Sequence, residues 1–182
     1  MASILEAAAR VLEREGFAGF NTNAIAALAG VGAGSLYQYF PDKESILRAL
    51  VVQEVEERVG RAIAAMSTHS GHGAVIAGVT AALAHAQQRP VLTMQLALAE
   101  PSILTDKHDR AVAGPLIAAL AAAITMDHGV PAEKAEALAH DVIGICKGLI
   151  MSAAARNDIG AAALIERVSV AVRSYLDAAA GA

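Results

Sequence analysis

The residues between Thr22 and Lys43 carry the side chains best suited to binding a nucleic acid. The amide of Gln38 can hydrogen-bond a base edge, with adenine as a good partner. Tyr37 and Tyr39 offer rings to sugars or thymine methyl groups and hydroxyls to phosphates. The hydroxyl of Thr22 and the ammonium of Lys43 suit phosphate oxygens. Each residue also has a plain structural interpretation: Thr22 is predicted to be the N-cap of a helix, the two tyrosines can be packing residues, and Gln38 and Lys43 can be solvated side chains.

Two short helices joined by a glycine turn are predicted to position these side chains. The pattern predicts one helix over residues 22–29, ended by Gly30, and a second over residues 33–40, with Leu36 facing inward. Pro41 ends the second helix, because proline lacks the backbone N–H and disfavours helix at the residue before it. Two such helices are typical of a helix-turn-helix motif, whose second helix enters the major groove of DNA.

The rest of the chain predicts helices and no strands. A first helix runs from about Ser3 to Gly16, and another, capped by Asp42, extends to about Met66. Further helices are predicted near residues 74–88, 91–99, 109–126, 132–156 and 161–179. The predicted fold class is therefore all-α, with about nine helices. A three-helix head would occupy residues 1–48, with its motif at about 21–40, and a C-terminal helical domain residues 49–182.

Composition and charge limit the function classes. The net charge is −4, and residues 1–48 hold four basic and five acidic side chains, which argues against nonspecific, charge-driven binding of nucleic acid by the whole chain. Cys146 is the sole cysteine, so an intrachain disulfide is excluded, as is typical of a reducing cytoplasm. No signal peptide is evident. The uncharged stretch 111–126 is shorter than the roughly 20 residues of a membrane span, so we expect a buried helix, a cytoplasmic location and no membrane contact.

Several short motifs resemble the N-terminal domain of TetR-family transcriptional regulators. They are LEAA at 5–8, EGF at 15–17, IA at 25–26, AGV at 29–31, GSLYQYF at 34–40 and KE at 43–44. The resemblance covers about the first quarter of the chain; the remainder is similar to the family only in length and helical layout. By position, it implies the DNA-facing residues Thr22, Asn23, Ala33, Gly34, Ser35, Tyr37, Gln38, Tyr39 and Lys43.

The resemblance also implies partners. Most such proteins are homodimers with two DNA-reading heads, which bind a pseudo-palindromic double-stranded DNA operator. A C-terminal domain dimerises and binds a small effector, here expected to be hydrophobic, that releases the repressor from DNA. No cofactor is expected.

The chain departs from the family pattern at two points. Ala33 stands where many members carry lysine or arginine, and few residues precede the first helix, where many carry a basic arm. Either DNA binding is modest, or the natural N-terminus is longer. Two functions therefore remain open: a ligand-responsive repressor, or a helical small-molecule-binding protein with weakened or lost DNA binding. No nucleophile elbow, phosphate loop, zinc helix or cofactor fingerprint is evident, so no enzyme is predicted.

Apolar residues recur at helical spacing on the last two predicted helices. The residues predicted for a dimer interface are Val142, Cys146, Leu149, Leu164, Val168, Val172 and Tyr175. The alternative is that both stripes belong to the internal core; the resemblance favours the dimer.

A candidate ligand pocket is predicted in the middle helices, because adaptable methionines and apolar walls suit hydrophobic ligands. Its residues would be Met66, His85, Gln88, Met94, Gln95, Leu98, Leu116, Leu120 and Ile124. Ordinary core packing is the alternative for each of them. His69 and His72 have the spacing of metal ligands but no cysteine or carboxylate nearby, so no metal site is predicted.

Overall fold

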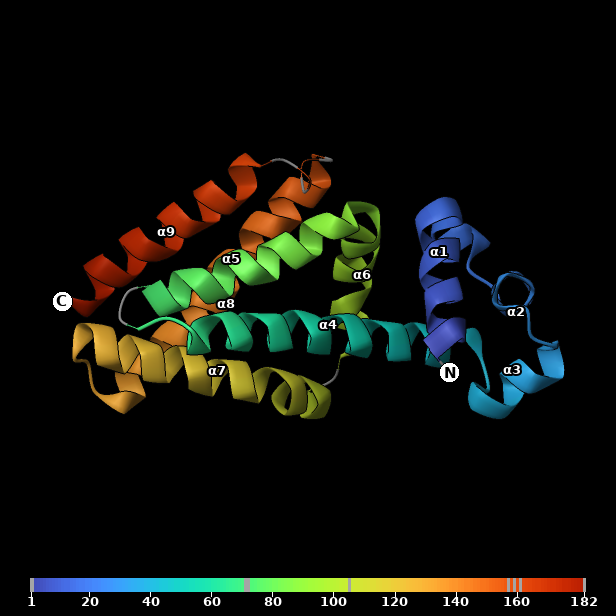
Figure 1. Ribbon diagram of the computed structural model, residues 1–182, viewed down its shortest axis with the longest axis horizontal. Coiled ribbons are helices and arrows are strands. Elements are labelled where there is room, and N and C mark those ends of the chain that lie inside the picture. The colour runs from blue at the N-terminus through green and yellow to red at the C-terminus, as the bar shows by residue number, and fades with distance from the viewer. Residues whose placement is uncertain are drawn as a thin grey trace. The chain divides into compact units, whose positions relative to one another are not determined.

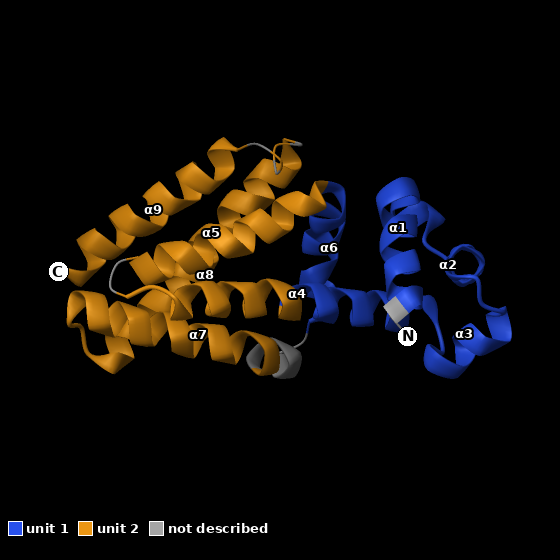
Figure 2. Cartoon of the chain, viewed as in Figure 1, with its two compact units in different colours: residues 1–55, 91–105 blue, residues 56–90, 106–182 orange. Residues whose placement is uncertain are grey.

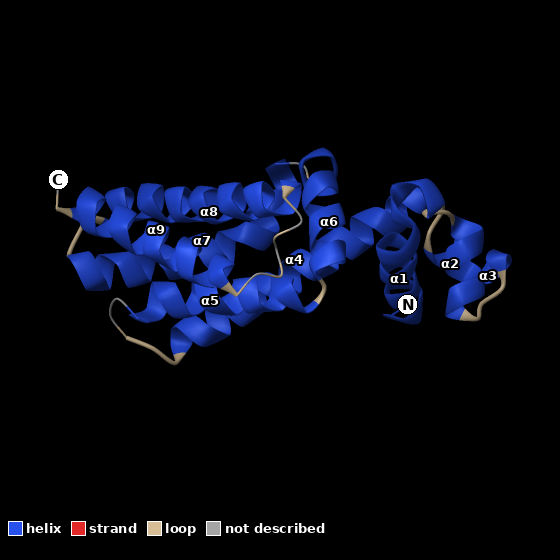
Figure 3. Ribbon diagram, turned by 90° about the horizontal axis from the view of Figure 1, so that it is seen from above, coloured by secondary structure: helices blue, strands red, loops and turns tan. Residues whose placement is uncertain are grey.

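The computed structural model describes the chain except residues 1, 71, 72, 105, 157, 159, 161 and 182, and the side chains of Ala2 and residues 106–110. Within the described residues the chain forms nine helices and no strand (Figures 1 and 3), which confirms the all-α prediction. The helices are α1 (Ala2–Gly19), α2 (Thr22–Ala29), α3 (Ala33–Tyr39), α4 (Lys43–Ser67), α5 (Gly73–Gln88), α6 (Pro90–Ile103), α7 (Asp106–His128), α8 (Ala132–Ala155) and α9 (Ala163–Ala180).

The helix ends of the first 45 residues follow local chemistry. Gly16 adopts φ 63° and ψ −166°, so regular helical geometry breaks there, although α1 resumes to Gly19. The N-cap of α2 is Asn21, whose Oδ1 accepts the Ala24 N–H at 2.9 Å; the prediction that Thr22 is the cap is wrong by one residue. Gly30 ends α2 in the left-handed conformation, as predicted.

The start of α4 is capped as predicted. Asp42 Oδ1 accepts the Ser45 N–H at 2.7 Å, and the Asp42 N–H donates to Ser45 Oγ at 3.3 Å. This reciprocal pair satisfies backbone groups that a helix N-terminus leaves without partners. It also fixes the direction in which the chain leaves Pro41, and so holds the end of α3 next to the beginning of α4.

The chain divides into two compact units (Figure 2). Unit 1 comprises residues 1–55 and 91–105, so it contains α1 to α3, the first half of α4 and nearly all of α6. Its core is built on fully buried apolar side chains, among them Leu12, Ile25, Leu36, Ile46 and Leu50. α1 packs on α2, and α2 on α3. The predicted functional division at residues 48 and 49 stays a prediction.

A hydrogen bond fixes the end of α6 within unit 1. The Arg48 guanidinium of α4 donates from Nη1 to the Ile103 carbonyl at 2.9 Å. The last carbonyls of a helix have no partner within it, so this contact caps α6 with a cation, which also suits the helix dipole.

Unit 2 comprises residues 56–90 and 106–182. α8 packs against α7 and α9, and α5 against α7 and α9. Asp158 lies between two arginines: Arg167 Nη2 donates to its Oδ2 at 3.2 Å and Arg156 Nη2 at 3.3 Å. These hydrogen bonds, the one from Arg167 first, lower the pKa of the Asp158 carboxyl. They join the end of α8 to the second turn of α9.

α7 is buried on one side only. Within residues 111–126, Leu120 and Ile124 are buried, whereas Pro115, Ala118 and Met126 are exposed, so the prediction of a buried helix holds for one side of this stretch only in the single chain. The stretch Ala111–His128 and α8 are each long and apolar enough to cross a membrane by length and composition alone. Core helices of soluble proteins pass the same test, so this is weak evidence for a membrane span.

Candidate nucleic-acid interface

The predicted DNA-facing residues lie together at the start of α2, along α3 and at the start of α4. All of them are exposed except Thr22, which is half-buried. Leu36 is fully buried and Phe40 is buried, so they anchor α3 to the head. Away from these buried residues, Tyr37 and Tyr39 have 51% and 59% of their surfaces exposed. The short helix therefore packs through one side and leaves a polar, aromatic side free.

Two hydroxyl groups meet between α2 and α3. Thr22 Oγ1 and Tyr37 OH lie 3.1 Å apart and form a hydrogen bond in which either can donate. Thr22 is the first residue of α2, where backbone N–H groups have no partner within the helix. The two hydroxyls and these N–H groups form a set of donors suited to one phosphate. The sequence predicts Thr22 and Tyr37 separately as phosphate contacts. It does not predict their hydrogen bond, because the two residues are fifteen positions apart and meet only when α3 packs on α2.

Gly34 is a helical residue with open space around it. It is the second residue of α3, and a Cβ added there would meet no atom within 4 Å. The chain's own packing therefore does not require glycine at this position. The lack of a side chain leaves room for another molecule's backbone to approach the start of α3.

Positive charge is scarce on this surface. Arg10 pairs with Glu6 at 2.8 Å on α1, and Arg48 is held by the Ile103 carbonyl. Lys43 is exposed at the start of α4, with its Nζ 4.0 Å from Glu44 Oε1, a distance at which an exposed pair is worth little. Binding of a polyanion here would rest mainly on hydroxyls, amides and helix N-termini.

The fold and this surface define a helix-turn-helix DNA-binding protein. Residues 4–50 match the family described as "Bacterial regulatory proteins, tetR family". No curated protein sequence matches the chain. The N-terminal domain is a TetR-family DNA-binding domain, and the whole chain has the fold of TetR-family transcriptional regulators, as the sequence resemblance predicted.

Three solved structures illustrate the similarity. A transcriptional regulator from Pseudomonas aeruginosa PAO1 aligns with a TM-score of 0.78 and 16% identity, covering 99% of this chain and 89% of that one. The fatty acid degradation regulator FadR from Bacillus halodurans gives 0.71 and 16%, covering 94% and 93%. The TetR-family repressor AlkX from Dietzia sp., implicated in biodegradation of n-alkanes, gives 0.65 and 16%, covering 97% and 93%. At these identities the likeness shows the fold alone.

The residues predicted for the ligand pocket are spread over both units. Met94, Gln95 and Leu98 belong to unit 1 and the other six to unit 2. Gln95 Nε2 lies 3.7 Å from the position of a Cβ on Gly16, beside the kink of α1. Met66 packs over Gly78, whose added Cβ would lie 2.6 Å from Met66 Cγ. These contacts give Gln95 and Met66 packing roles within their own units.

The residues predicted for the dimer interface fall into two groups that differ in burial. Val142, Leu164, Val168 and Val172 have at most 1% of their surfaces exposed within a single chain. Cys146, Leu149 and Tyr175 are half-buried. The first four therefore pack inside unit 2. Direct contact with a partner would have to come from the other three and from exposed neighbours on α8 and α9.

Two polar or reactive side chains on α8 and α9 have plain structural roles. Tyr175 OH donates to Asp141 Oδ2, which joins the two helices, and the Asp141 hydrogen bond raises the pKa of the Tyr175 phenol. Burial raises the pKa of the Cys146 thiol to about 11, so at neutral pH it stays protonated and a poor nucleophile.

The structure does not describe the pair of histidines, His69 and His72, as a whole. His72 lies outside the described residues. His69 Nδ1 lies 2.9 Å from the Ala65 carbonyl, to which it donates. Among the described side chains no group of three or more His, Cys, Asp or Glu residues could hold a metal ion.

Proposed function

We propose that the protein is a ligand-responsive repressor. It binds a pseudo-palindromic DNA operator as a homodimer in the cytoplasm and is released by a small hydrophobic molecule. The observation that carries this proposal is the exposed polar and aromatic side of α3, held by buried Leu36 and Phe40 within a domain that matches the TetR family. α3 would enter the major groove, where Gln38 reads a base edge. The Thr22–Tyr37 pair and Lys43 would bind phosphates on either side.

Exposed residues of α8 and α9 support a dimer. Gly144 and Gly148 lie four residues apart on α8, and a Cβ added at either would meet nothing within 4 Å. Small residues at this spacing allow a second helix to approach closely. Met151 on α8 and Val170 on α9 are exposed apolar side chains, with 36% and 57% of their surfaces accessible. A partner protomer would cover these residues and fix the spacing of the two heads at about 34–36 Å, one turn of DNA.

α4 is the element through which an effector would act. It runs from Lys43 to Ser67, so its first half belongs to unit 1 and its second half to unit 2. An effector that binds one position of α4 better than another would change the spacing of the heads, since only differential affinity shifts an equilibrium. FadR is described as a fatty acid degradation regulator and AlkX as implicated in biodegradation of n-alkanes, which supports a hydrophobic effector for this chain.

The salt dependence of operator binding tests the proposal against the alternative, a head that has lost DNA binding. We expect binding at low salt to DNA from upstream of the protein's own gene, measured by fluorescence anisotropy. The slope of log affinity against log salt should be shallow. Lys43→Gln should reduce the slope by about 0.9 for each head, because each phosphate contact by a cation releases counterions. Arg10→Gln, which removes a cation paired on α1, is the matched control and should leave the slope unchanged. Absence of binding at low salt would contradict the repressor and favour the alternative.

A second test uses the open space at Gly34. Gly34→Ala should not destabilise the protein and should raise its free energy of unfolding by up to about 1 kcal/mol, because alanine has the higher helix propensity. It should nevertheless weaken operator binding, since the new methyl group occupies the space left for the DNA backbone. Thermal unfolding and anisotropy measure the two effects. Gly60→Ala is the control, because Gly60 on α4 also has open space around it but lies in unit 2. If the Gly34→Ala variant binds the operator as tightly as the Gly60→Ala variant, close approach of the DNA backbone to Gly34 is refuted.

A further inference from the structure

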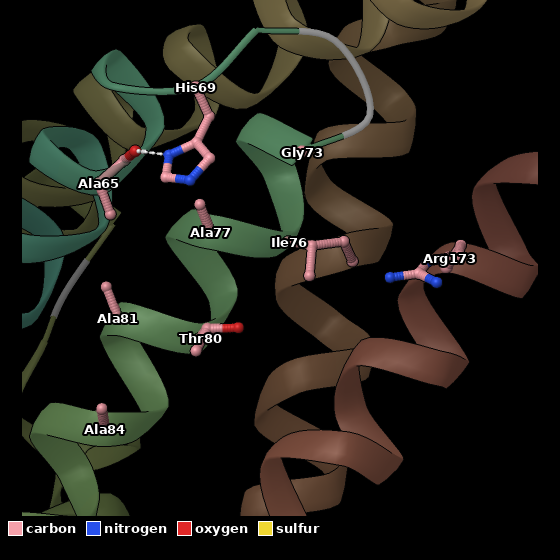
Figure 4. A pocket seen from close by; sticks show the side chains of 9 residues that line it. All are labelled: Ala65, His69, Gly73, Ile76, Ala77, Thr80, Ala81, Ala84 and Arg173. Atoms are coloured by element: carbon pink, nitrogen blue, oxygen red, sulfur yellow. Dashed lines mark hydrogen bonds between the residues drawn. The ribbon is translucent and has the colours of Figure 1, made fainter.

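An open cavity of about 520 Å³ lies at the surface of unit 2, and each of its lining residues is exposed or half-buried. It is lined by the end of α4, one side of α5 and one residue of α9 (Figure 4). On α5 the lining runs from Gly73 to Ala84, twelve residues and about 16 Å along the helix. The volume falls within the range typical of small-molecule sites. None of the residues that the sequence predicts for a ligand pocket lines this cavity.

Most of the cavity wall is apolar and made of small side chains. Ala77, Ala81 and Ala84 recur along α5, and Ala65 lies opposite on α4. Ile76 adds the largest apolar side chain of the lining. Such a wall offers no hydrogen bonds, so it suits a hydrocarbon group.

The polar groups of the cavity favour an anion. Figure 4 shows the Thr80 hydroxyl and the Arg173 guanidinium pointing toward the same part of the cavity. In the described part of the chain neither the Thr80 hydroxyl nor the Arg173 guanidinium forms a hydrogen bond or ion pair, and none of the nine lining residues is acidic. A cationic ligand would meet the charge of Arg173 with no carboxylate to offset it. A carboxylate would gain a charge-assisted hydrogen bond.

His69 lines the cavity near the start of α5 without competing for the anion. Its Nδ1 donates a hydrogen bond to the Ala65 carbonyl at 2.9 Å and lies 3.0 Å from Thr68 Oγ1. Its Cδ2 lies 3.8 Å from the position of a Cβ on Gly73, so the ring lies against the first turn of α5. It therefore adds wall surface at this end and leaves Arg173 as the cationic group of the lining.

We propose that this cavity is the effector site and that its ligand is an amphipathic carboxylic acid. The carboxylate binds Arg173 and Thr80, and the hydrocarbon chain lies along the alanines of α5. The effector role rests on the repressor function proposed above, whereas the binding site itself does not. The site therefore selects fatty acids and similar amphipathic acids over neutral hydrocarbons and over cationic drugs.

Calorimetric titration of the full-length protein with decanoate tests the site. Decanol has the same chain without the charge and should bind about tenfold more weakly. Arg173→Gln should reduce decanoate affinity to the level of decanol and leave decanol binding unchanged, while Arg173→Lys should retain most of the preference. Arg61→Gln, an exposed arginine of unit 2 outside the lining, should change neither.

A second variant tests the apolar wall of the cavity. Ala81→Phe fills the cavity and should abolish binding of both compounds in a protein whose circular dichroism is unchanged. Absence of decanoate binding, equal binding of decanoate and decanol, or unchanged binding in Arg173→Gln and Ala81→Phe would each overturn the proposed site.

Decanoate should also release the protein from its operator. If decanoate binds as predicted but leaves operator affinity unchanged, the site stands and its effector role is refuted.

Discussion

Replacing Gln38 with alanine should lower the affinity for the operator by about 1–3 kcal/mol, or about tenfold to more than a hundredfold. Gln38 is exposed on α3 between Tyr37 and Tyr39, and the helix is fixed beneath it by Leu36 and Phe40. Its amide carries a donor and an acceptor, so it can make a bidentate contact with one base pair. Alanine removes both hydrogen bonds without disturbing the packing of the head.

The effect of Gln38→Ala should be confined to sequence-specific binding. Competition between the operator and variants altered at single base pairs should show that discrimination is lost at one position in each half-site. Nonspecific binding should be unchanged, because it depends on phosphate contacts. Gln88→Ala, at the exposed end of α5, is the matched control. Equal loss of affinity for operator and random DNA would show that Gln38 reads no base.

Replacing Leu36 with alanine should reduce the free energy of unfolding of the head by about 2–5 kcal/mol. Leu36 has 0% of its surface exposed, and α3 has only seven residues. A helix this short is not stable alone in water, so its structure depends on this anchor. DNA binding should be lost along with stability, because the DNA-facing residues of α3 share the helix with Leu36.

Urea unfolding followed by far-UV circular dichroism measures this effect. The two units can unfold in separate steps, so the transition of unit 1 must be fitted on its own. Leu98→Ala is the matched control: this leucine belongs to the same unit but has 58% of its surface exposed, and its loss should change stability by no more than about 0.5 kcal/mol. Similar losses for both variants would show that Leu36 does not anchor α3.

Local chemistry made the head predictable from the sequence. Gly30 and Pro41 delimit short helices, and the spacing of Leu36 and Phe40 assigns the inner side of α3. The N-cap was misplaced because Asn21 and Thr22 are adjacent and both are good capping residues. Only the extended backbone of Asn21, with φ −144° and ψ 158°, distinguishes them, and that conformation is set by packing in the head.

The C-terminal unit was less predictable, because periodicity identifies the apolar side of a helix but not the helix that covers it. Val168 and Val172 form such a stripe, yet they pack inside the chain. The cavity joins Ala65, Ala84 and Arg173, which lie far apart in the sequence and include small residues with no strong pattern. Arg173 is exposed on α9, and no pattern in the sequence distinguishes it from other solvated cations.

The hydrogen bond from Arg48 to the Ile103 carbonyl has a consequence for how the protein folds during its synthesis. Unit 1 is discontinuous in the chain, since it needs residues 91–105 as well as residues 1–55. A ribosome delivers the recognition helix early but completes its unit only after residues 56–90 have also been made. Domains generally fold as units during synthesis, so the DNA-binding head would mature late, once α6 is available. A newly made chain would then acquire its full affinity for DNA only when part of the effector-binding half already exists.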